Sequence, residues 1–375
     1  MRVLQLISSN GFYGAEAMVT LLSTHLVEIG CEVTMGIFQA PDTTESALEA
    51  AAEKNLLPVW HLACAGRFDP WTVVRLLRFL RSEQIDVLHT HGYKADLYGL
   101  LAARLASCTL VATCHNWTDR TAILQRYSSL DKFLLRWFDR VVAVSASVTA
   151  NLAQAGVPTT KLCMIHNGID TEQYFEKIPQ VWSGRPIVLG TTARLSREKG
   201  IDVLIRALPS IVKQYPDLLC VVVGEGPERI PLLTLAEELG VTRNLLLPGF
   251  QKQIATFLAG CSVIVLPSRK EGLPLAILEA MAAAKPIVAS AVGGIPALLG
   301  DAGAGMLVPA GDSEALAGGV LCLLADAELR ARYAANAAAY VRKHFEARPM
   351  ARSYLEIYGE LSEALIPQPT SPMSA

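Results

Sequence analysis

Two glutamates in one segment, Glu271 and Glu279, are the residues most suited to chemistry; they lie in VLPSRKEGLPLAILEAMAAAKPIVAS. From Pro274 onward the segment has strong helix formers and an apolar stripe, which predicts a helix. Glu271 would lie at its start and Glu279 about two turns along. Carboxylates accept hydrogen bonds from sugar hydroxyls, and amides at a helix start can hold a phosphate. An exposed helical charge is the alternative for Glu279, but its neighbours are apolar.

A pair of cations in TTARLSREKGIDVLI suits a pyrophosphate group. Arg194 ends a predicted strand, and Lys199 follows five residues later, just before Gly200 and a predicted helix. Arginine would bind the anion with two hydrogen bonds and lysine as a point charge. A solvated charged turn is the alternative. A further acidic residue, Glu225 in VVVGEGPE, follows another buried strand.

Three histidines follow or end predicted strands: His89 and His91 in VLHTHGYKADLYG, and His115 in VATCHNW. The carboxyl ends of parallel strands are where doubly wound sheets bind ligands. In SSNGFYGAEAM, Gly11 and Gly14 let the backbone approach a ligand at a helix start. Their spacing is not that of the dinucleotide fingerprint, which argues against a dehydrogenase.

Short β-branched apolar runs alternate with helical patterns along the chain. The strands predicted in the first half are 3–7, 32–38, 58–62, 86–89, 110–114, 140–144 and 162–165. Those predicted in the second half are 187–191, 218–223, 244–247, 262–266, 286–289 and 306–308. Most are continuously apolar, as strands covered on both faces are, so we expect parallel sheets with helical crossovers.

The 375 residues exceed one ordinary core, so two domains are expected. The segment 171–186, TEQYFEKIPQVWSGRP, has prolines and little apolar periodicity and is predicted to be a linker. One α/β domain would span 1–170 and another 187–344, each with a doubly wound parallel sheet. The tail 367–375 is expected to be disordered.

The amino-acid composition argues against several classes of protein. The chain is 51% hydrophobic and 18% charged with a net charge of −2, which fits a globular protein and gives no sign of nucleic-acid binding. The eight cysteines show no spacing typical of a zinc site. The sequence has neither an apolar run long enough to span a membrane nor a signal-peptide core, so a cytoplasmic location is expected.

Taken together, the motifs resemble glycosyltransferase family 4, the "glycosyl transferases group 1" enzymes. The most specific is E-x7-E, from Glu271 to Glu279. The supporting motifs are GAE at 14–16, HxH at 89–91, His115, VSASV at 144–148, HNGID at 166–170, R-x4-KG at 194–200, GEGP at 224–227, PGF at 248–250 and VGGIP at 292–296. The resemblance implies a GT-B fold, two Rossmann-like domains facing across a cleft, with a terminal helix near 345–365 packing back on the first domain.

The resemblance also implies site residues. Catalytic roles fall to His115, Arg194, Lys199 and Glu271. Donor-binding roles fall to Gly14, Arg194, Lys199, Glu225, Gly272, Leu273 and Glu279. The acceptor side would include Tyr13 and His91; Tyr13 stands where the family often has a glycine. Arg194 and Lys199 would neutralise the leaving diphosphate, Glu279 would bind ribose, and Glu271 would face the transferred sugar.

The resulting expectation is a retaining hexosyltransferase-type enzyme that moves a sugar from a nucleotide-diphosphate sugar to an acceptor hydroxyl. Its setting would be cell-surface polysaccharide or glycolipid synthesis. No Asp-x-Asp motif occurs, so we expect no metal and no other cofactor. Two alternatives remain: an enzyme like UDP-N-acetylglucosamine epimerase, and a non-catalytic sugar-nucleotide-binding protein.

A membrane surface is a further expected partner. Residues 67–140 hold 11 Lys and Arg against 7 Asp and Glu, and WTVVRLLRFLRSEQ predicts a basic amphipathic helix. Such a helix can lie among anionic headgroups, which predicts peripheral attachment to the inner face of the cell membrane and a saccharide or lipid-linked acceptor. The alternative is an ordinary helix that packs its leucines on the sheet.

Overall fold

The computed structural model describes residues 1–8, 14–39, 47–66, 68–115, 122–175, 184 and 186–365. The predictions for Gly11, Tyr13, the tail 367–375 and most of 176–185 concern residues outside these ranges. The chain forms two compact units. The first comprises Met1–His166 with Ala347–Ala375, and the second comprises Asn167–Glu346.

The first unit contains a seven-stranded sheet in the order β3-β2-β1-β4-β5-β6-β7. Its strands are β1 (Arg2–Ile7), β2 (Glu32–Gln39), β3 (Val59–Ala63), β4 (Val87–His91), β5 (Thr109–Cys114), β6 (Arg140–Ala143) and β7 (Leu162–Met164). Every paired strand runs parallel to its neighbour. The order reverses between β1 and β4, which makes this the switch point of the sheet.

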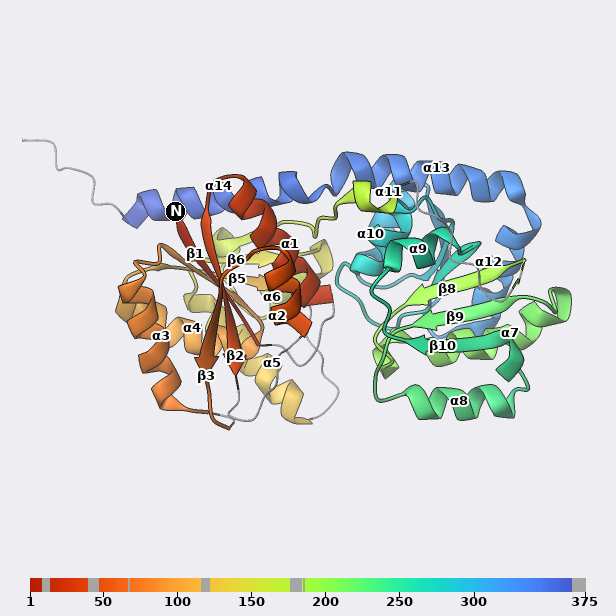
Figure 1. Cartoon of the computed structure of the whole chain (residues 1–375), viewed down its shortest axis with the longest axis horizontal. Helices are drawn as coiled ribbons and strands as arrows, with labels where there is room; N and C mark the ends of the chain where they lie inside the picture. Colours follow the sequence, from red (N-terminus) through yellow and green to blue (C-terminus); the bar gives the residue numbers. More distant parts are fainter. Residues whose placement is uncertain are drawn as a thin grey trace, which may run out of the picture. The chain divides into compact units, whose positions relative to one another are not determined.

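Helices connect and cover these strands. They are α1 (Gly14–Glu28), α2 (Ala47–Lys54), α3 (Pro70–Ser82), α4 (Tyr93–Ala106), α5 (Ala122–Leu134), the short η1 (Leu135–Trp137), α6 (Ala146–Gln154) and η2 (Thr159–Lys161). Helix α4 contacts both α3 and α5, while α1 contacts α2 and the last helix, α14 (Ala347–Leu365). The sheet is therefore covered by two separate helix layers, as the continuous apolar strands require (Figure 1).

The second unit contains a six-stranded parallel sheet in the order β10-β9-β8-β11-β12-β13. Its strands are β8 (Val188–Thr192), β9 (Leu219–Val223), β10 (Leu245–Gly249), β11 (Val263–Leu266), β12 (Ile287–Ser290) and β13 (Gly305–Val308). Its helices are η3 (Thr171–Tyr174), η4 (Arg197–Lys199), α7 (Ile201–Gln214), α8 (Arg229–Glu238), η5 (Thr242–Asn244), α9 (Ile254–Ala259), α10 (Leu275–Ala282), α11 (Ile295–Ala302), α12 (Ser313–Ala325) and α13 (Ala327–His344). Here the switch point lies between β8 and β11.

All thirteen predicted strands are present, each with ends within two residues of the prediction, and the expected parallel pairing is confirmed. Residues 171–174, within the predicted linker, form η3 and belong to the second unit, because Thr171 and Tyr174 are buried there.

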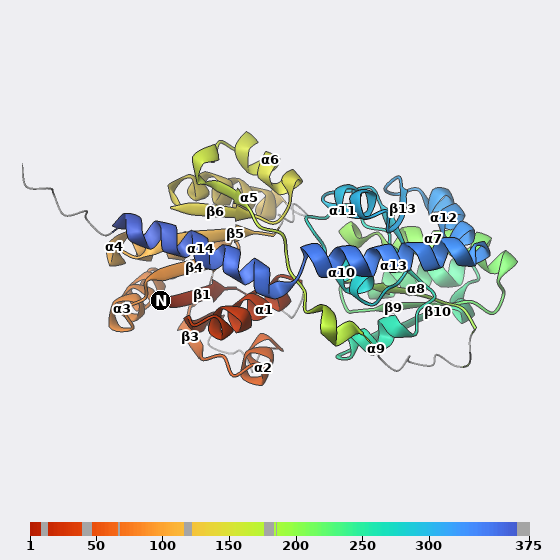
Figure 2. The same cartoon turned by 90° about the horizontal axis from the view of Figure 1, so that it is seen from above.

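The terminal helix α14 lies against the first unit, to which it belongs (Figure 2). Its Tyr358 is fully buried, with the hydroxyl 2.7 Å from Nδ1 of His89 on β4. One turn earlier, the Tyr354 hydroxyl lies 3.0 Å from Oγ1 of Thr113 on β5. Residues 241 and 269 positions apart in the sequence thus share one buried polar network.

Candidate active site

In the second unit, Glu271 lies in the loop between β11 and α10, where it forms an ion pair. The Nζ atom of Lys199 lies 2.7 and 2.9 Å from the two carboxylate oxygens, and Ser268 Oγ donates to Oε1 at 2.7 Å. The side chain of Glu271 is only 8% exposed and that of Lys199 is 26% exposed. Paired and hydrogen-bonded in this way, the carboxylate is held in one orientation.

The ion pair lies beside the switch point of the second sheet. The residues that line a small cavity there are Thr191, Thr192, Ala193, Lys199, Leu266, Pro267, Ser268, Glu271 and Ala276. These residues follow or end β8 and β11, the two strands between which the strand order reverses. Open α/β sheets bind their ligands at this position, so this is the strongest site candidate in the second unit.

Helix α10 begins later than the sequence suggested. Pro274 is the N-cap residue with ψ of 130°, and the helix starts at Leu275. The helix predicted from Pro274 onward therefore begins one residue later, and Glu271 lies in the loop that leads into it, four residues before Leu275. Leu273 precedes a proline, which disfavours helical backbone at that position, so Gly272 and Leu273 stay in the loop.

Two glycines let this loop lie close to its neighbours. Gly200 follows Lys199 with φ of +63°, and a Cβ atom there would lie 2.0 Å from the carbonyl oxygen of Pro267. Gly293, in VGGIP, has φ of +59°, and a Cβ atom there would lie 2.1 Å from the carbonyl oxygen of Glu271. Only glycine fits both the backbone conformation and the space at these positions.

Glu279 lies in the second turn of α10, and its Oε1 accepts a hydrogen bond from the Tyr174 hydroxyl at 3.2 Å. Burial raises the pKa of Glu279 to about 7, and the hydrogen bond from Tyr174 opposes that rise. Burial also raises the pKa of Tyr174, so its hydroxyl remains a donor at neutral pH. Near neutrality Glu279 is therefore poised between its acid and carboxylate forms.

The remaining predicted donor residues lie in nearby loops of the same unit. Arg194 follows β8 and is exposed. Glu225 follows β9, with Oε1 3.6 Å from Nη1 of Arg229. The carbonyl oxygen of Leu273 accepts from Asn167 Nδ2 at 2.9 Å, so the HNGID motif fixes the loop of Glu271.

In the first unit the rings of the three histidines lie close together. His91 lies between the others, with its ring 4.2 Å from that of His89 and 5.7 Å from that of His115. His89 is fully buried, and His91 is 4% exposed with Nε2 2.8 Å from Oε1 of Gln5. Both therefore pack inside the unit. The placement of His91 on the acceptor side stays a prediction.

His115 directly follows β5. Its Nε2 atom is buried and has no hydrogen-bond partner among the residues that the structure describes. Burial lowers the pKa of His115 to about 4, so the ring is neutral at pH 7. Gly14, the first residue of α1, is exposed, and a Cβ atom there would have no neighbour within 4 Å. The backbone of Gly14 is therefore open to a ligand, and the roles of Gly14 and His115 stay predictions.

Sequence reasoning missed three residues that hold the proposed site. Ser268 and Asn167 lie in quoted motifs, but a serine or asparagine side chain gives no sign of its distant partner. Tyr174 lies in the segment taken as a linker, where its burial could not be foreseen.

Within the described ranges, no group of three or more His, Cys, Asp or Glu residues is placed to hold a metal ion, and no helix is long and apolar enough to cross a membrane.

Two α/β units with entirely parallel sheets define the class of fold, GT-B. A crystal structure of Anabaena HepE in complex with UDP-glucose supports this, with a TM-score of 0.84 at 23% identity over 96% of this chain and 100% of that one. Residues 12–173 match the model for Glycosyltransferase Family 4, and residues 173–340 match that for Glycosyl transferases group 1. The chain belongs to this family and is a sugar transferase.

Two relatives illustrate the range of the family. The phosphatidyl-myo-inositol mannosyltransferase of Mycobacterium leprae is 30% identical over 88% of this chain and 89% of its own. The N-acetyl-alpha-D-glucosaminyl L-malate synthase of Bacillus anthracis is 28% identical over 78% of this chain and 79% of its own. Their names indicate acceptors as different as a phospholipid and a small hydroxy acid.

Proposed function

We propose that this enzyme transfers a sugar, with retention of configuration, from a nucleotide-diphosphate sugar to an acceptor hydroxyl. The observation that carries the proposal is the ion pair of Lys199 and Glu271 beside the switch point of the second sheet. A cation there suits the diphosphate, and a fixed carboxylate suits sugar hydroxyls.

The donor roles follow from chemistry and family likeness. Arg194 and Lys199 neutralise the diphosphate, whose charge grows as the bond to the anomeric carbon breaks through an oxocarbenium-like transition state. Preorganised cations at that point lower the barrier because they bind the transition state better than the donor. Glu279 accepts from the ribose hydroxyls, and Glu271 orients the transferred sugar beside the amides of Gly272 and Leu273. Glu225 and Gly14 complete the donor contacts.

His115 would act at the reacting face, near the transferred sugar, and Tyr13 and His91 would contribute to the acceptor side. A neutral imidazole at pH 7 can accept a hydrogen bond from a sugar hydroxyl without opposing positive charge at the anomeric carbon. The acceptor is a lipid-linked or growing saccharide, and the enzyme associates peripherally with an anionic membrane. The lipid named in the Mycobacterium leprae relative supports this choice.

Binding and turnover test the proposal in turn. A thermal-shift panel of UDP, GDP and ADP and their sugars should give one clear stabiliser, since a ligand that binds only the folded state raises the melting temperature. If no compound in the panel raises the melting temperature, the proposal of a nucleotide-sugar site is contradicted. With the donor identified, NMR of the product should show the anomeric configuration of the donor; inversion contradicts the mechanism. Turnover of UDP-N-acetylglucosamine alone would indicate an epimerase.

Metal independence is a separate prediction. Arg194 and Lys199 supply the positive charge for which other transferases use a divalent cation, so transfer should continue at an unchanged rate in EDTA. The measurement is the initial rate with and without chelator. A loss of activity that Mg²⁺ or Mn²⁺ restores contradicts this prediction.

A further inference from the structure

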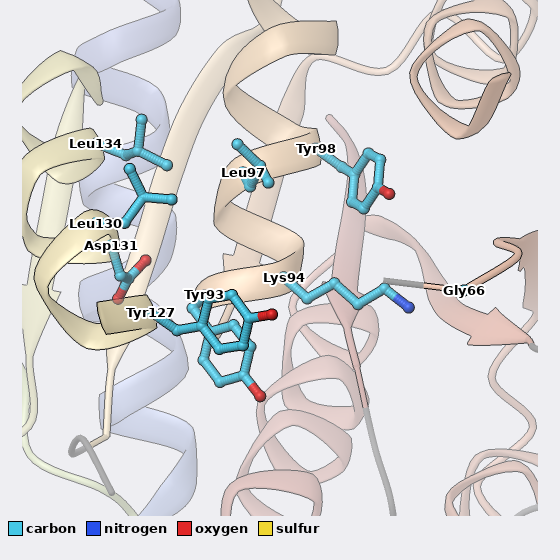
Figure 3. A pocket seen from close by; sticks show the side chains of 9 residues that line it. All are labelled: Gly66, Tyr93, Lys94, Leu97, Tyr98, Tyr127, Leu130, Asp131 and Leu134. Carbon is cyan, nitrogen blue, oxygen red and sulfur yellow. The ribbon is translucent and has the colours of Figure 1, made fainter. Parts of the chain in front are cut away.

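A cavity of about 300 Å³ lies in the first unit between α4 and α5 (Figure 3). The residues that matter in its lining are Tyr93, Lys94 and Leu97 of α4 and Tyr127, Leu130 and Leu134 of α5. None of these residues has a role in the proposed donor site. The volume holds about ten water-sized groups at roughly 30 Å³ each.

The walls are apolar and aromatic. Leu97 and Leu130 face the cavity from the two helices, and Leu130 is 45% exposed. At one end the rings of Tyr93 and Tyr127 stack with centroids 5.4 Å apart and planes 9° apart. Leucines that line an open cavity expose apolar surface to water, which favours an apolar occupant.

The charged groups of the cavity point to an anion at its rim. Lys94 supplies a cation, with Nζ 4.8 Å from the centre of the Phe38 ring. Asp131 also lines the cavity but forms a hydrogen bond with Asp96, whose pKa is raised well above its usual value by burial and by Asp131. Burial and the mutual hydrogen bond disfavour ionisation of this pair, so it repels an anion less than two independent carboxylates would.

The apolar surface continues beyond the cavity. Leu101 and Leu105 extend the stripe of Leu97 at four-residue spacing along α4, and they are 42% and 57% exposed. On the other helix and the η1 turn after it, Phe133 and Trp137 are 48% and 43% exposed. A chain longer than the cavity would therefore have apolar surface to follow.

We propose that this cavity binds the phosphate-proximal part of the apolar chain of a lipid phosphate, with Lys94 pairing the phosphate. About ten heavy atoms correspond to the first two prenyl units or a short length of acyl chain. The inference rests on the proposed function in one respect: the lipid would be the carrier of the acceptor saccharide.

The test is binding of farnesyl phosphate to the full chain by calorimetry, without donor and below the micelle concentration. Farnesol, inorganic phosphate and dihexanoyl phosphatidate are the comparison ligands. Farnesyl phosphate or the phosphatidate should bind, and the tighter of the two identifies a prenyl or an acyl source. Inorganic phosphate should bind at least about tenfold more weakly, because the chain supplies most of the buried area.

Variants locate the site. Leu97→Trp fills the cavity and should weaken binding about tenfold or more, whereas Leu105→Trp, two turns along the same stripe, should change it less than about twofold. Lys94→Gln should weaken farnesyl phosphate about tenfold and leave farnesol unchanged. Leu130→Glu is a second cavity variant at a half-exposed position and should also abolish binding without unfolding the chain.

Three outcomes overturn the proposal: no binding of either lipid phosphate, equal losses in Leu97→Trp and Leu105→Trp, or farnesol affinity that falls with Lys94→Gln. Equal losses would indicate adsorption on the outer surface. Donor-induced thermal shifts are measured on the same variants. They should remain, so failure of the lipid site is distinguishable from failure of the transferase proposal.

Discussion

Glu271 and Glu279 lie eight residues apart and have different surroundings. Glu271 is paired with the Lys199 ammonium group and accepts a hydrogen bond from Ser268. Glu279 accepts a hydrogen bond from the neutral Tyr174 hydroxyl, and burial works against its charge. The two carboxyls should therefore respond differently to substitution and to pH.

Glu271→Gln should lower kcat by about 10- to 150-fold. This factor corresponds to the loss of one hydrogen bond to a charged group, which contributes about 1.5–3 kcal/mol. The amide cannot pair with Lys199, so both the sugar contact and the loop order that matter at the transition state are weakened. Steady-state kinetics at saturating acceptor measure the effect. Glu314→Gln, exposed on α12, is the control. A wild-type kcat in Glu271→Gln would contradict its proposed role.

Glu279→Gln should instead raise the donor KM by a similar factor of about 10 to 150 and change kcat less, because ribose is bound alike in ground and transition states. Normal donor binding in this variant would show that Glu279 is not the ribose ligand.

The pKa of Glu279 adds a pH dependence. Ribose hydroxyls need the carboxylate as acceptor, so kcat/KM for donor in the wild type should rise with pH and level off above about 7. The effect on stability has the opposite sign. The folded pKa of Glu279 lies above its usual value of 4.5, so the contribution of Glu279 to the free energy of unfolding falls as pH rises from 4.5 to 7. Glu279→Gln should flatten both profiles, which kinetics and urea titrations at several pH values will measure.

At the level of elements, the contact between the Lys199 turn and the β11–α10 loop depends on Gly200. Gly200→Ala would place a Cβ 2.0 Å from a backbone oxygen, so it should lower the free energy of unfolding by more than about 2 kcal/mol and weaken donor binding. Gly240→Ala is a matched control, because Gly240 also has positive φ (+67°) but open space; it should cost only about 1–2 kcal/mol. Equal urea midpoints for the two variants would contradict this account.

The elements were predictable where apolar residues run continuously, because a strand covered on both faces is apolar along its whole length. The helix containing Glu279 was also predicted, with its start placed at Pro274, one residue before the observed start at Leu275. The partners of the site residues could not be found. Ser268 and Tyr174 reach Glu271 and Glu279 only through folded geometry, and Asn167 contacts Leu273 across 106 positions of sequence.

For the molecule as a whole, the structure modifies the basis of the membrane prediction. Helix α3 buries Leu76 and Leu80, Arg75 pairs with Asp69 at 2.9 Å, and Phe79 stacks on Trp60. Leu76 and Leu80 therefore pack on the sheet, as the alternative interpretation of this helix expected. They are not available for insertion into a membrane, so α3 cannot embed its whole apolar face there. Trp71, at the start of α3, is 67% exposed, and two further exposed aromatic side chains, Phe133 and Trp137, lie on α5 and η1 beside basic residues.

We expect the protein to co-sediment with anionic liposomes at low salt and to be released as salt rises, since basic residues and anionic headgroups attract over about a Debye length. Phe133→Ser with Trp137→Ser should lower the bound fraction, while Leu56→Ser, an exposed leucine elsewhere in the unit, should not. Neutral liposomes are the lipid control. A protein that stays wholly in the supernatant contradicts the prediction.

The discontinuous first unit has a consequence for biosynthesis. Its sheet is covered partly by α14, so Tyr354 and Tyr358 can reach Thr113 and His89 only after residues 347–365 have been translated. The second unit is continuous and complete at Glu346. Although the ribosome makes the first unit's strands first, the second unit can finish folding earlier. During that interval the nascent first unit leaves part of one face of its sheet uncovered, which makes it the stage most exposed to chaperones and to aggregation.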